Sequence, residues 1–211
     1  MNKEFDEIGY KVVRNVIPWP IAEFITQYEL IDEVQNFTEE ERIHAQVANS
    51  HSRYADPAME TVLLHLQETM EKETGLSLFP TYSYYRVYRN GHSLAPHTDR
   101  PSCEISATVC FDYSYDKEKF SWPIYMAGKE VILNPGDVAI YKGCEVEHWR
   151  NKLEYSEKVW QVQGFFHYVN ANGPNKEWKF DKRPNIGYKR SQVSTQMNNQ
   201  SQFAKSYVKQ I

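Results

Sequence analysis

The stretch Thr81-Tyr-Ser-Tyr-Tyr-Arg-Val-Tyr-Arg89, followed at once by Asn90-Gly91, decides the fold class of this sequence. Its β-branched and aromatic residues favour a strand, and Asn-Gly is a strong signal for a tight turn. From 78 to 170 the chain continues as short runs of such residues separated by turn residues, which predicts an all-β barrel or sandwich. Besides 81–89, the expected strands are 103–111, 122–126, 129–133, 138–141, 144–149 and 158–169.

Two amphipathic helices are expected before this β region. Pro20 suits the first residue of a helix whose apolar stripe would be Ile21, Phe24, Ile25 and Tyr28. A second helix is expected between Asp56-Pro57, a cap and first helical residue, and Gly75. Its apolar face would consist of Met59, Val62, Leu63, Leu66 and Met70.

We expect one domain of 211 residues, because this length suits a single ordinary domain. Each expected helix has one apolar stripe, so both need a surface to pack against. The expected organisation is a helical buttress over 1–77, a β-barrel catalytic core over 78–170 and a polar, basic C-terminal extension over 171–211.

The composition is that of a globular protein, with 41 % hydrophobic and 25 % charged residues. A net charge of −4 and a pI near 6.0 argue against a general nucleic-acid binder. Three cysteines at 103, 110 and 144 match no zinc or disulfide framework, and no stretch resembles a signal peptide or a membrane span. We therefore expect a cytoplasmic protein without nucleic-acid or membrane partners; the sequence leaves its oligomeric state open.

The C-terminal part of the chain is strongly basic. From Asn170 onward eight Lys and Arg residues stand against Glu177 and Asp181, a local net charge of +6. Two interpretations stay open: this segment folds onto the acidic remainder of the chain, which is the simpler one, or it binds an acidic partner.

A candidate metal site begins with His97-Thr98-Asp99. Residues two apart on an extended segment point to the same side, so the imidazole and the carboxylate would converge. An isolated pair of this kind is weak evidence. His148 follows 49 residues after Asp99, a gap in which three or four short strands could circle a barrel and bring it beside the pair. Two histidines and one carboxylate on one face of an octahedral ion form the triad of non-haem Fe(II) oxygenases.

Lys158, ten residues after His148, is the candidate counter-charge for an anionic ligand. If it opens the strand 158–169, period two places it on one face with Trp160, Val162, Gly164 and Phe166. A cation below apolar walls suits a dicarboxylate whose other end binds the metal. The alternative is a solvated lysine at the end of a strand.

Together these residues resemble the Fe(II)/2-oxoglutarate-dependent oxygenases, most closely their prolyl-4-hydroxylase-like branch. The branch has HxD, a distal His and a Lys ten residues later, which His97, Asp99, His148 and Lys158 match. It also has a Tyr nine residues before the first ligand, the position of Tyr88. The resemblance covers roughly 78–170 and implies a mainly β (α+β) fold, a double-stranded β-helix (jelly-roll, cupin-like) barrel buttressed by N-terminal helices.

The resemblance also implies the chemistry of the site. His97, Asp99 and His148 would bind Fe(II), with 2-oxoglutarate and O2 as co-substrates. The far carboxylate of 2-oxoglutarate would meet Lys158 and Tyr88, with Trp160 also in the co-substrate site. The expected reaction is hydroxylation of an unactivated C–H bond, of a prolyl residue or another amino-acid substrate, with release of succinate and CO2.

Several alternatives stay open. The substrate could instead be a small metabolite. A zinc- or cupin-type hydrolase, or a binding barrel, is the alternative class, because two histidines and a carboxylate also hold catalytic zinc.

Three further residues are candidates for substrate binding. Arg86 shares a strand face with several tyrosines, so it either binds an anionic substrate group or stacks on those rings at the surface. Arg100 and Glu104 lie within five residues of Asp99 and either contact the substrate or form a local ion pair. Neither is typical of peptidyl-proline enzymes, so the choice between a peptide, a protein and a small molecule stays open. His167, on the face opposite Lys158, is expected to be structural.

Overall fold

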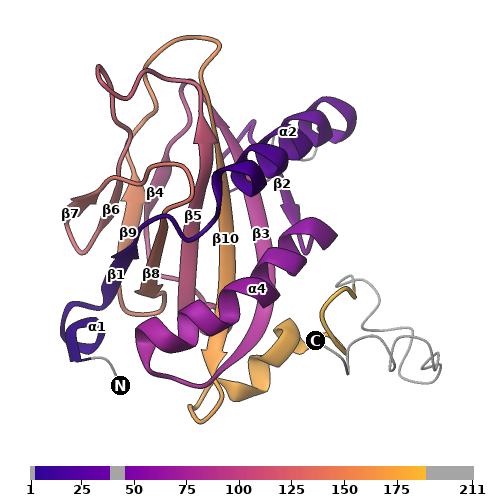
Figure 1. Cartoon of the computed structure of the whole chain (residues 1–211), viewed down its shortest axis with the longest axis vertical. Coiled ribbons are helices and arrows are strands. Elements are labelled where there is room, and N and C mark those ends of the chain that lie inside the picture. Colours follow the sequence, from indigo (N-terminus) through magenta and orange to yellow (C-terminus); the bar gives the residue numbers. More distant parts are fainter. Residues whose placement is uncertain (1–2, 39–45, 189–211) are drawn as a thin grey trace.

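The computed structural model describes residues 3–38 and 46–188, and two antiparallel β-sheets form its centre (Figure 1). The large sheet has the strand order β1-β8-β5-β10-β3-β2, and the small sheet has the order β4-β9-β6-β7. From β3 onward the chain passes back and forth between the two sheets. This arrangement is a double-stranded β-helix, so the expected mainly β fold is confirmed.

Three adjacent strands of the large sheet have 9 to 12 residues, and the other seven described strands have three to five. The described strands are β1 (Tyr10–Val13), β2 (His51–Tyr54), β3 (Leu78–Arg89), β4 (Leu94–His97), β5 (Ile105–Tyr113), β6 (Ile124–Met126), β7 (Lys129–Val131), β8 (Val138–Lys142), β9 (His148–Arg150) and β10 (Trp160–Asn170). The described helices are α1 (Lys3–Ile8), α2 (Trp19–Asn36), α4 (Pro57–Thr74) and the 3-10 segments η1 (Pro101–Cys103) and η2 (Lys176–Lys182).

All seven strands expected from the sequence are present, with ends shifted by up to four residues. Three more strands, β1, β2 and β4, have four residues each. Segments this short carry too few residues for a clear alternation, and pairing with a longer neighbour holds them extended. Because β1 and β2 join the edges of the large sheet, the segment 1–77 contributes strands as well as helices.

Helices α2 and α4 lie across one face of the large sheet and bury the main hydrophobic core against it (Figure 1). In α4 the expected signals hold. The Asp56 carboxylate accepts hydrogen bonds from the N–H groups of Ala58 and Met59, a cap that contributes about 1 kcal/mol, and Gly75 ends the helix with φ 71°. The five expected apolar residues of this helix are all buried.

The apolar stripe expected for α2 is correct in part. Ile25 is buried and Tyr28 is half-buried, whereas Ile21 and Phe24 are exposed. The helix also buries Ala22, Thr26 and Glu29, so its buried face includes two polar side chains that the apolar periodicity does not predict.

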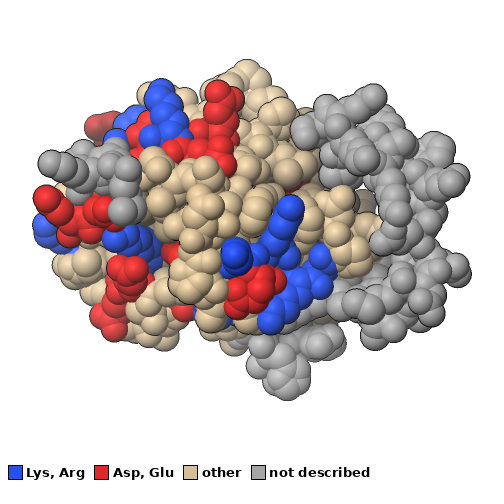
Figure 2. Space-filling model, turned by 90° about the horizontal axis from the view of Figure 1, so that it is seen from below, with Lys and Arg blue, Asp and Glu red and all other residues tan. Residues whose placement is uncertain are grey.

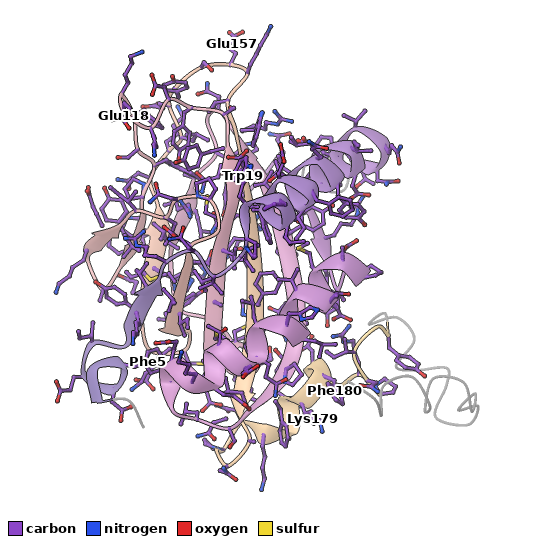
Figure 3. The ribbon with its side chains drawn as sticks, viewed as in Figure 1. Phe5, Trp19, Glu118, Glu157, Lys179 and Phe180 are labelled. Carbon is purple, nitrogen blue, oxygen red and sulfur yellow. The ribbon has the colours of Figure 1, made fainter. Side chains whose placement is uncertain are left out.

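Residues 171–188 fold back below α4, where Figure 3 labels two of them, Lys179 and Phe180. Arg183 and Glu60 form a fully buried ion pair at 2.6 Å, and Arg183 also donates to the carbonyl of Thr81 at 2.9 Å. Seen from below, basic and acidic side chains are mixed on this face rather than gathered in a patch of one sign (Figure 2). These contacts fit the expectation that the basic segment folds onto the remainder of the chain; Lys189, Arg190, Lys205 and Lys209 lie outside the described residues.

Among the described residues no helix has the length and apolarity needed to cross a membrane.

Candidate metal centre

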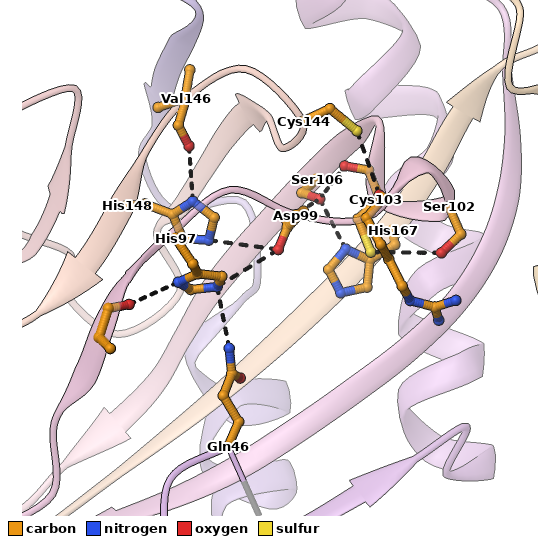
Figure 4. A network of polar contacts seen from close by, with 12 residues as sticks. Gln46, His97, Asp99, Ser102, Cys103, Ser106, Cys144, Val146, His148 and His167 are labelled. Carbon is orange, nitrogen blue, oxygen red and sulfur yellow. Dashed lines mark hydrogen bonds and ion pairs between the residues drawn. The ribbon is translucent and has the colours of Figure 1, made fainter.

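Three side chains from β4, β9 and the turn after β4 meet at one point (Figure 4). His97 is the last residue of β4 and pairs directly with His148, the first residue of β9. The Oδ1 atom of Asp99 lies 3.7 Å from Nε2 of His97 and 3.8 Å from Nε2 of His148. Ligands bound to one ion at about 2.1 Å are no more than about 4.2 Å apart, so these separations fit a shared cation.

Both imidazoles are held in the tautomer that metal binding requires. Nδ1–H of His97 donates to the carbonyl of Ala95, and Nδ1–H of His148 donates to the carbonyl of Val146, each at 2.9 Å. A proton on Nδ1 leaves the lone pair of Nε2 available to an ion. Burial lowers the pKa of His148 to about 4, so this ring is neutral near pH 7.

The Asp99 carboxylate is fixed by its neighbours. Its backbone N–H donates to the carbonyl of Gly143 at 2.8 Å, and the Ser106 hydroxyl donates to Oδ2 at 3.2 Å. A Cβ on Gly143 would stand 2.6 Å from Oδ2 of Asp99 and 2.1 Å from the carbonyl oxygen of Cys103, so only glycine fits there. Burial raises the pKa of Asp99, and a bound cation would favour its ionised form.

A pocket of about 370 Å³ opens beside these three side chains. Gln46 stands at its edge, where its amide nitrogen donates to Nε2 of His97 and its amide oxygen accepts from Arg86, each at 3.3 Å. No sequence signal pointed to Gln46. Other side chains that line the pocket are Tyr82, Tyr84, Arg86, Arg100, Cys103 and His167.

Arg86 places an unbalanced positive charge in this pocket. The side chain is 1 % exposed, donates to the Tyr88 hydroxyl at 3.3 Å, and lies over the rings of Tyr84 and Tyr88 at 5.4 and 5.6 Å. Among the described residues its Nε–H has no hydrogen-bond partner, and the groups that do bind the guanidinium include no carboxylate. A buried guanidinium without a counter-charge is costly, so this part of the pocket favours an anion.

A second buried guanidinium, Arg150, lies on β9 and was not among the expected site residues. It donates to the carbonyl of Trp122 at 2.9 Å and to Oε1 of Gln163 at 3.2 Å, and it stands 5.9 Å from the centre of the Tyr88 ring. It too has no carboxylate partner within the described part of the chain. Its spacing of two residues from His148 on one strand is the signal that could have found it.

Lys158 and Trp160 do not lie in the pocket. Lys158 is exposed in the turn before β10, beside Glu157 at the tip of the β9–β10 loop (Figure 3). Trp160 packs against the core under the helices, as do Val162 and Phe166. The predicted alternation of this strand is correct but its phase is inverted, because the polar face, with Gln163 and His167, points away from the helices.

The remaining expected residues have different surroundings. Arg100 lines the pocket and binds Asp181 through two hydrogen bonds of 2.9 and 3.0 Å, so its charge is balanced. Glu104 accepts from the backbone N–H of Asn170 at 3.0 Å and does not line the pocket. His167, expected to be structural, lines the pocket beside Asp99.

No protein-family model and no curated protein sequence matches this chain. Solved structures do match. A prolyl-4-hydroxylase from Pseudomonas putida has 14 % identity and a TM-score of 0.59, covering 78 % of this chain and 95 % of its own. The non-heme alpha-ketoglutarate-dependent epimerase SnoN from nogalamycin biosynthesis has 12 % identity and a TM-score of 0.66, covering 89 % and 90 %. HygX from Streptomyces hygroscopicus, solved with nickel and 2-oxoglutarate, has 13 % identity and a TM-score of 0.59, covering 81 % and 86 %. This chain therefore has the fold of the 2-oxoglutarate-dependent oxygenases.

Proposed function

We propose that this protein is an Fe(II)- and 2-oxoglutarate-dependent oxygenase. The observation that carries the proposal is the pairing of a two-histidine, one-carboxylate triad with a buried, unbalanced guanidinium in the same pocket. A dicarboxylate that binds the metal at one end needs a counter-charge for its other end. The fold of the neighbouring oxygenases supports the same conclusion.

His97, Asp99 and His148 are the proposed iron ligands. The donor set fits Fe(II), since both histidines present Nε2 and only one carboxylate faces them. These three residues would hold the ion and leave room at it for small ligands. With iron and 2-oxoglutarate bound, the site supplies oxygen activation: 2-oxoglutarate, O2 and R–H give succinate, CO2 and R–OH.

Arg86, rather than Lys158, is the proposed anchor for the far carboxylate of 2-oxoglutarate. Arg86 lines the pocket, and the buried Tyr88 hydroxyl, which is not part of the pocket lining, accepts a hydrogen bond from it and helps to orient it. Arg150 lies 5.9 Å from the centre of the same Tyr88 ring and adds positive potential. Gln46 would leave His97 when iron binds, because both require the Nε2 lone pair.

A zinc-dependent hydrolase would use the same triad, but it would leave both guanidinium groups without a role. The neighbouring structures include a hydroxylase and an epimerase, so the fold is compatible with several outcomes at a C–H bond. The primary substrates that we propose to test are peptidyl proline, free amino acids and small metabolites.

The test starts without oxygen. Adding Fe(II) and 2-oxoglutarate should produce the visible charge-transfer band of the chelate, and His148→Ala should abolish it. Admitting O2 should then release succinate, faster when a true substrate is present among proline-rich peptides, amino acids and metabolites. Absence of the band in the wild-type protein, together with tight zinc binding, would reject the oxygenase proposal.

A further inference from the structure

Cys103 and His167 line the pocket, yet the proposed oxygenase reaction gives them no role. They lie on the Asp99 side of the iron triad, where Cys103 ends η1 and His167 faces inward from β10 (Figure 4). One ligand atom from each of Asp99, Cys103 and His167 lies within 4.8 Å of the other two. Cys103 is 2 % exposed and His167 is 6 % exposed, so two of the three potential ligands are buried, and Asp99 is half-buried beside them.

The two oxygens of Asp99 point to different neighbours. Oδ1 faces the two histidines of the iron triad, whereas Oδ2 accepts from Ser106, whose hydroxyl is also 2.8 Å from Nδ1 of His167. One carboxylate can thus serve cations on either of its sides.

The ligand types on the second side differ from those on the first. A thiolate, an imidazole and a carboxylate together favour zinc and similar thiophilic divalent cations over iron or magnesium. Zinc ligands at about 2.0–2.3 Å are about 3.5 Å apart in a tetrahedral site, so the side chains need to close in by about an ångström. The fourth position would face the pocket.

Burial and the Asp99 carboxylate raise the pKa of the Cys103 thiol to about 12, so the sulfur keeps its proton until a metal ion displaces it, and two hydroxyl groups can then stabilise the thiolate. The Tyr82 hydroxyl lies 3.1 Å from Sγ of Cys103, and the Ser102 hydroxyl lies 3.8 Å from it, so both can donate to a sulfur that has lost its proton. A bound zinc ion deprotonates a coordinating thiol outright, and the proton is released to solvent. Donors of this kind around metal ligands tune and orient them.

We propose that Asp99, Cys103 and His167 form a second cation site, for zinc or another thiophilic divalent cation. This site does not depend on the proposed oxygenase function.

Cobalt(II) is the probe, because a thiolate bound to cobalt gives an intense near-ultraviolet charge-transfer band that histidine and carboxylate ligands do not give. The full chain carrying His97→Ala and His148→Ala isolates the second site. We expect this variant to develop the thiolate band with one equivalent of cobalt, and Zn²⁺ to displace it. Adding Cys103→Ser should abolish the band, and His167→Asn should weaken cobalt binding by roughly tenfold or more, since even indirect partners of metal ligands cost that much.

Cys144→Ser is the matched control, because this thiol is also close to the Asp99 turn but donates to the carbonyl of Arg100 at 3.4 Å. It should keep the band. A band that survives Cys103→Ser, or no band in a variant whose circular dichroism matches the wild type, overturns the proposal. If the double variant unfolds, the same titration of Cys103→Ser against the wild type decides: equal thiolate bands reject the site. None of these measurements uses 2-oxoglutarate, so they can reject the second cation site without rejecting the proposed oxygenase function, and the reverse.

Discussion

Arg86 carries a full positive charge in the interior, and its neighbours among the described residues are tyrosine hydroxyls and rings and the amide of Gln46. A buried charge without a counter-charge destabilises the empty pocket. An anion that binds there is stabilised strongly, because its carboxylate forms an ion pair with the guanidinium. The charge of the exposed Lys158 is already solvated by water, so an anion gains less by binding it. At the residue scale, binding energy for a dicarboxylate is therefore concentrated at Arg86.

Replacing this residue tests that distribution. We expect Arg86→Met to raise the Kd of 2-oxoglutarate by roughly tenfold to a hundredfold, the loss of about 1.5–3 kcal/mol for a charged hydrogen bond. The affinity for the metal alone should change little. Calorimetric titration of 2-oxoglutarate into the anaerobic Fe(II) protein measures the first quantity, and titration of Fe(II) into the protein without 2-oxoglutarate measures the second.

Lys158→Ala is the paired control and should leave the Kd of 2-oxoglutarate unchanged. If Lys158→Ala raises the Kd of 2-oxoglutarate and Arg86→Met does not, the far carboxylate binds Lys158 in the β9–β10 loop and not Arg86.

At the scale of elements, the sequence predicts what depends on neighbours along the chain and misses what depends on neighbours in space. The caps of α4 are local, and they were predicted correctly. The phase of β10 depends on which face meets the helices. Its even-numbered residues, such as Trp160, Val162 and Phe166, are the more apolar set, and this difference could have assigned them to the core. The assumption that Lys158 faces the pocket placed these even-numbered residues on the pocket side, which is the wrong face of the strand.

Helix α2 shows the same limit more sharply, because it buries Glu29 completely, and both carboxylate oxygens lack a hydrogen-bond partner within residues 3–38 and 46–188. Burial raises the pKa of Glu29 well above its ordinary value, and the charges of Asp56 and Asp32 raise it further. The folded protein therefore keeps a proton on Glu29 at pH values where the unfolded chain has lost it.

This difference predicts how stability depends on pH. From about pH 4.5 upward, the Glu29 contribution to the free energy of unfolding should fall by up to about 1.4 kcal/mol per pH unit, until Glu29 ionises in the folded protein as well. Glu29→Gln removes this loss, so the variant should gain stability relative to wild type between pH 5 and pH 7.5. Urea unfolding at both values measures the gain.

Glu23→Gln, at an exposed position of the same helix, should show no such gain. If the stability difference between Glu29→Gln and wild type is the same at both pH values, Glu29 is not protonated in the fold.

At the scale of the whole molecule, the iron triad joins parts of the chain that are far apart in sequence. His97 and Asp99 lie at one end of β4, His148 begins β9, and Gly143 of the intervening turn supports Asp99. The ring of strands that brings them together is the fold itself. The sequence could predict these three ligands because their spacing reflects that topology. It could not predict Gln46, whose role depends on packing.

Ligands that bind only the assembled pocket should therefore stabilise the whole protein. With 2-oxoglutarate present at about 100 times its Kd for the Fe(II) protein, mass action adds about 2.7 kcal/mol to the stability of that protein, and its Tm should rise by roughly 5–10 °C. Anaerobic thermal unfolding followed by circular dichroism measures this shift. Asp99→Ala should abolish it, and a full shift with 2-oxoglutarate alone would contradict metal-dependent binding.

Gly143 has a consequence for recognising this site in other chains. Because any side chain there would collide with the carboxylate below it, a chain that builds the same site needs glycine five residues before its distal histidine. The pattern His-x-Asp followed later by Gly-x-x-x-x-His is thus a stricter search query than the three ligands alone. It selects for the space that the aspartate carboxylate needs beside the glycine, as well as for the three metal ligands themselves.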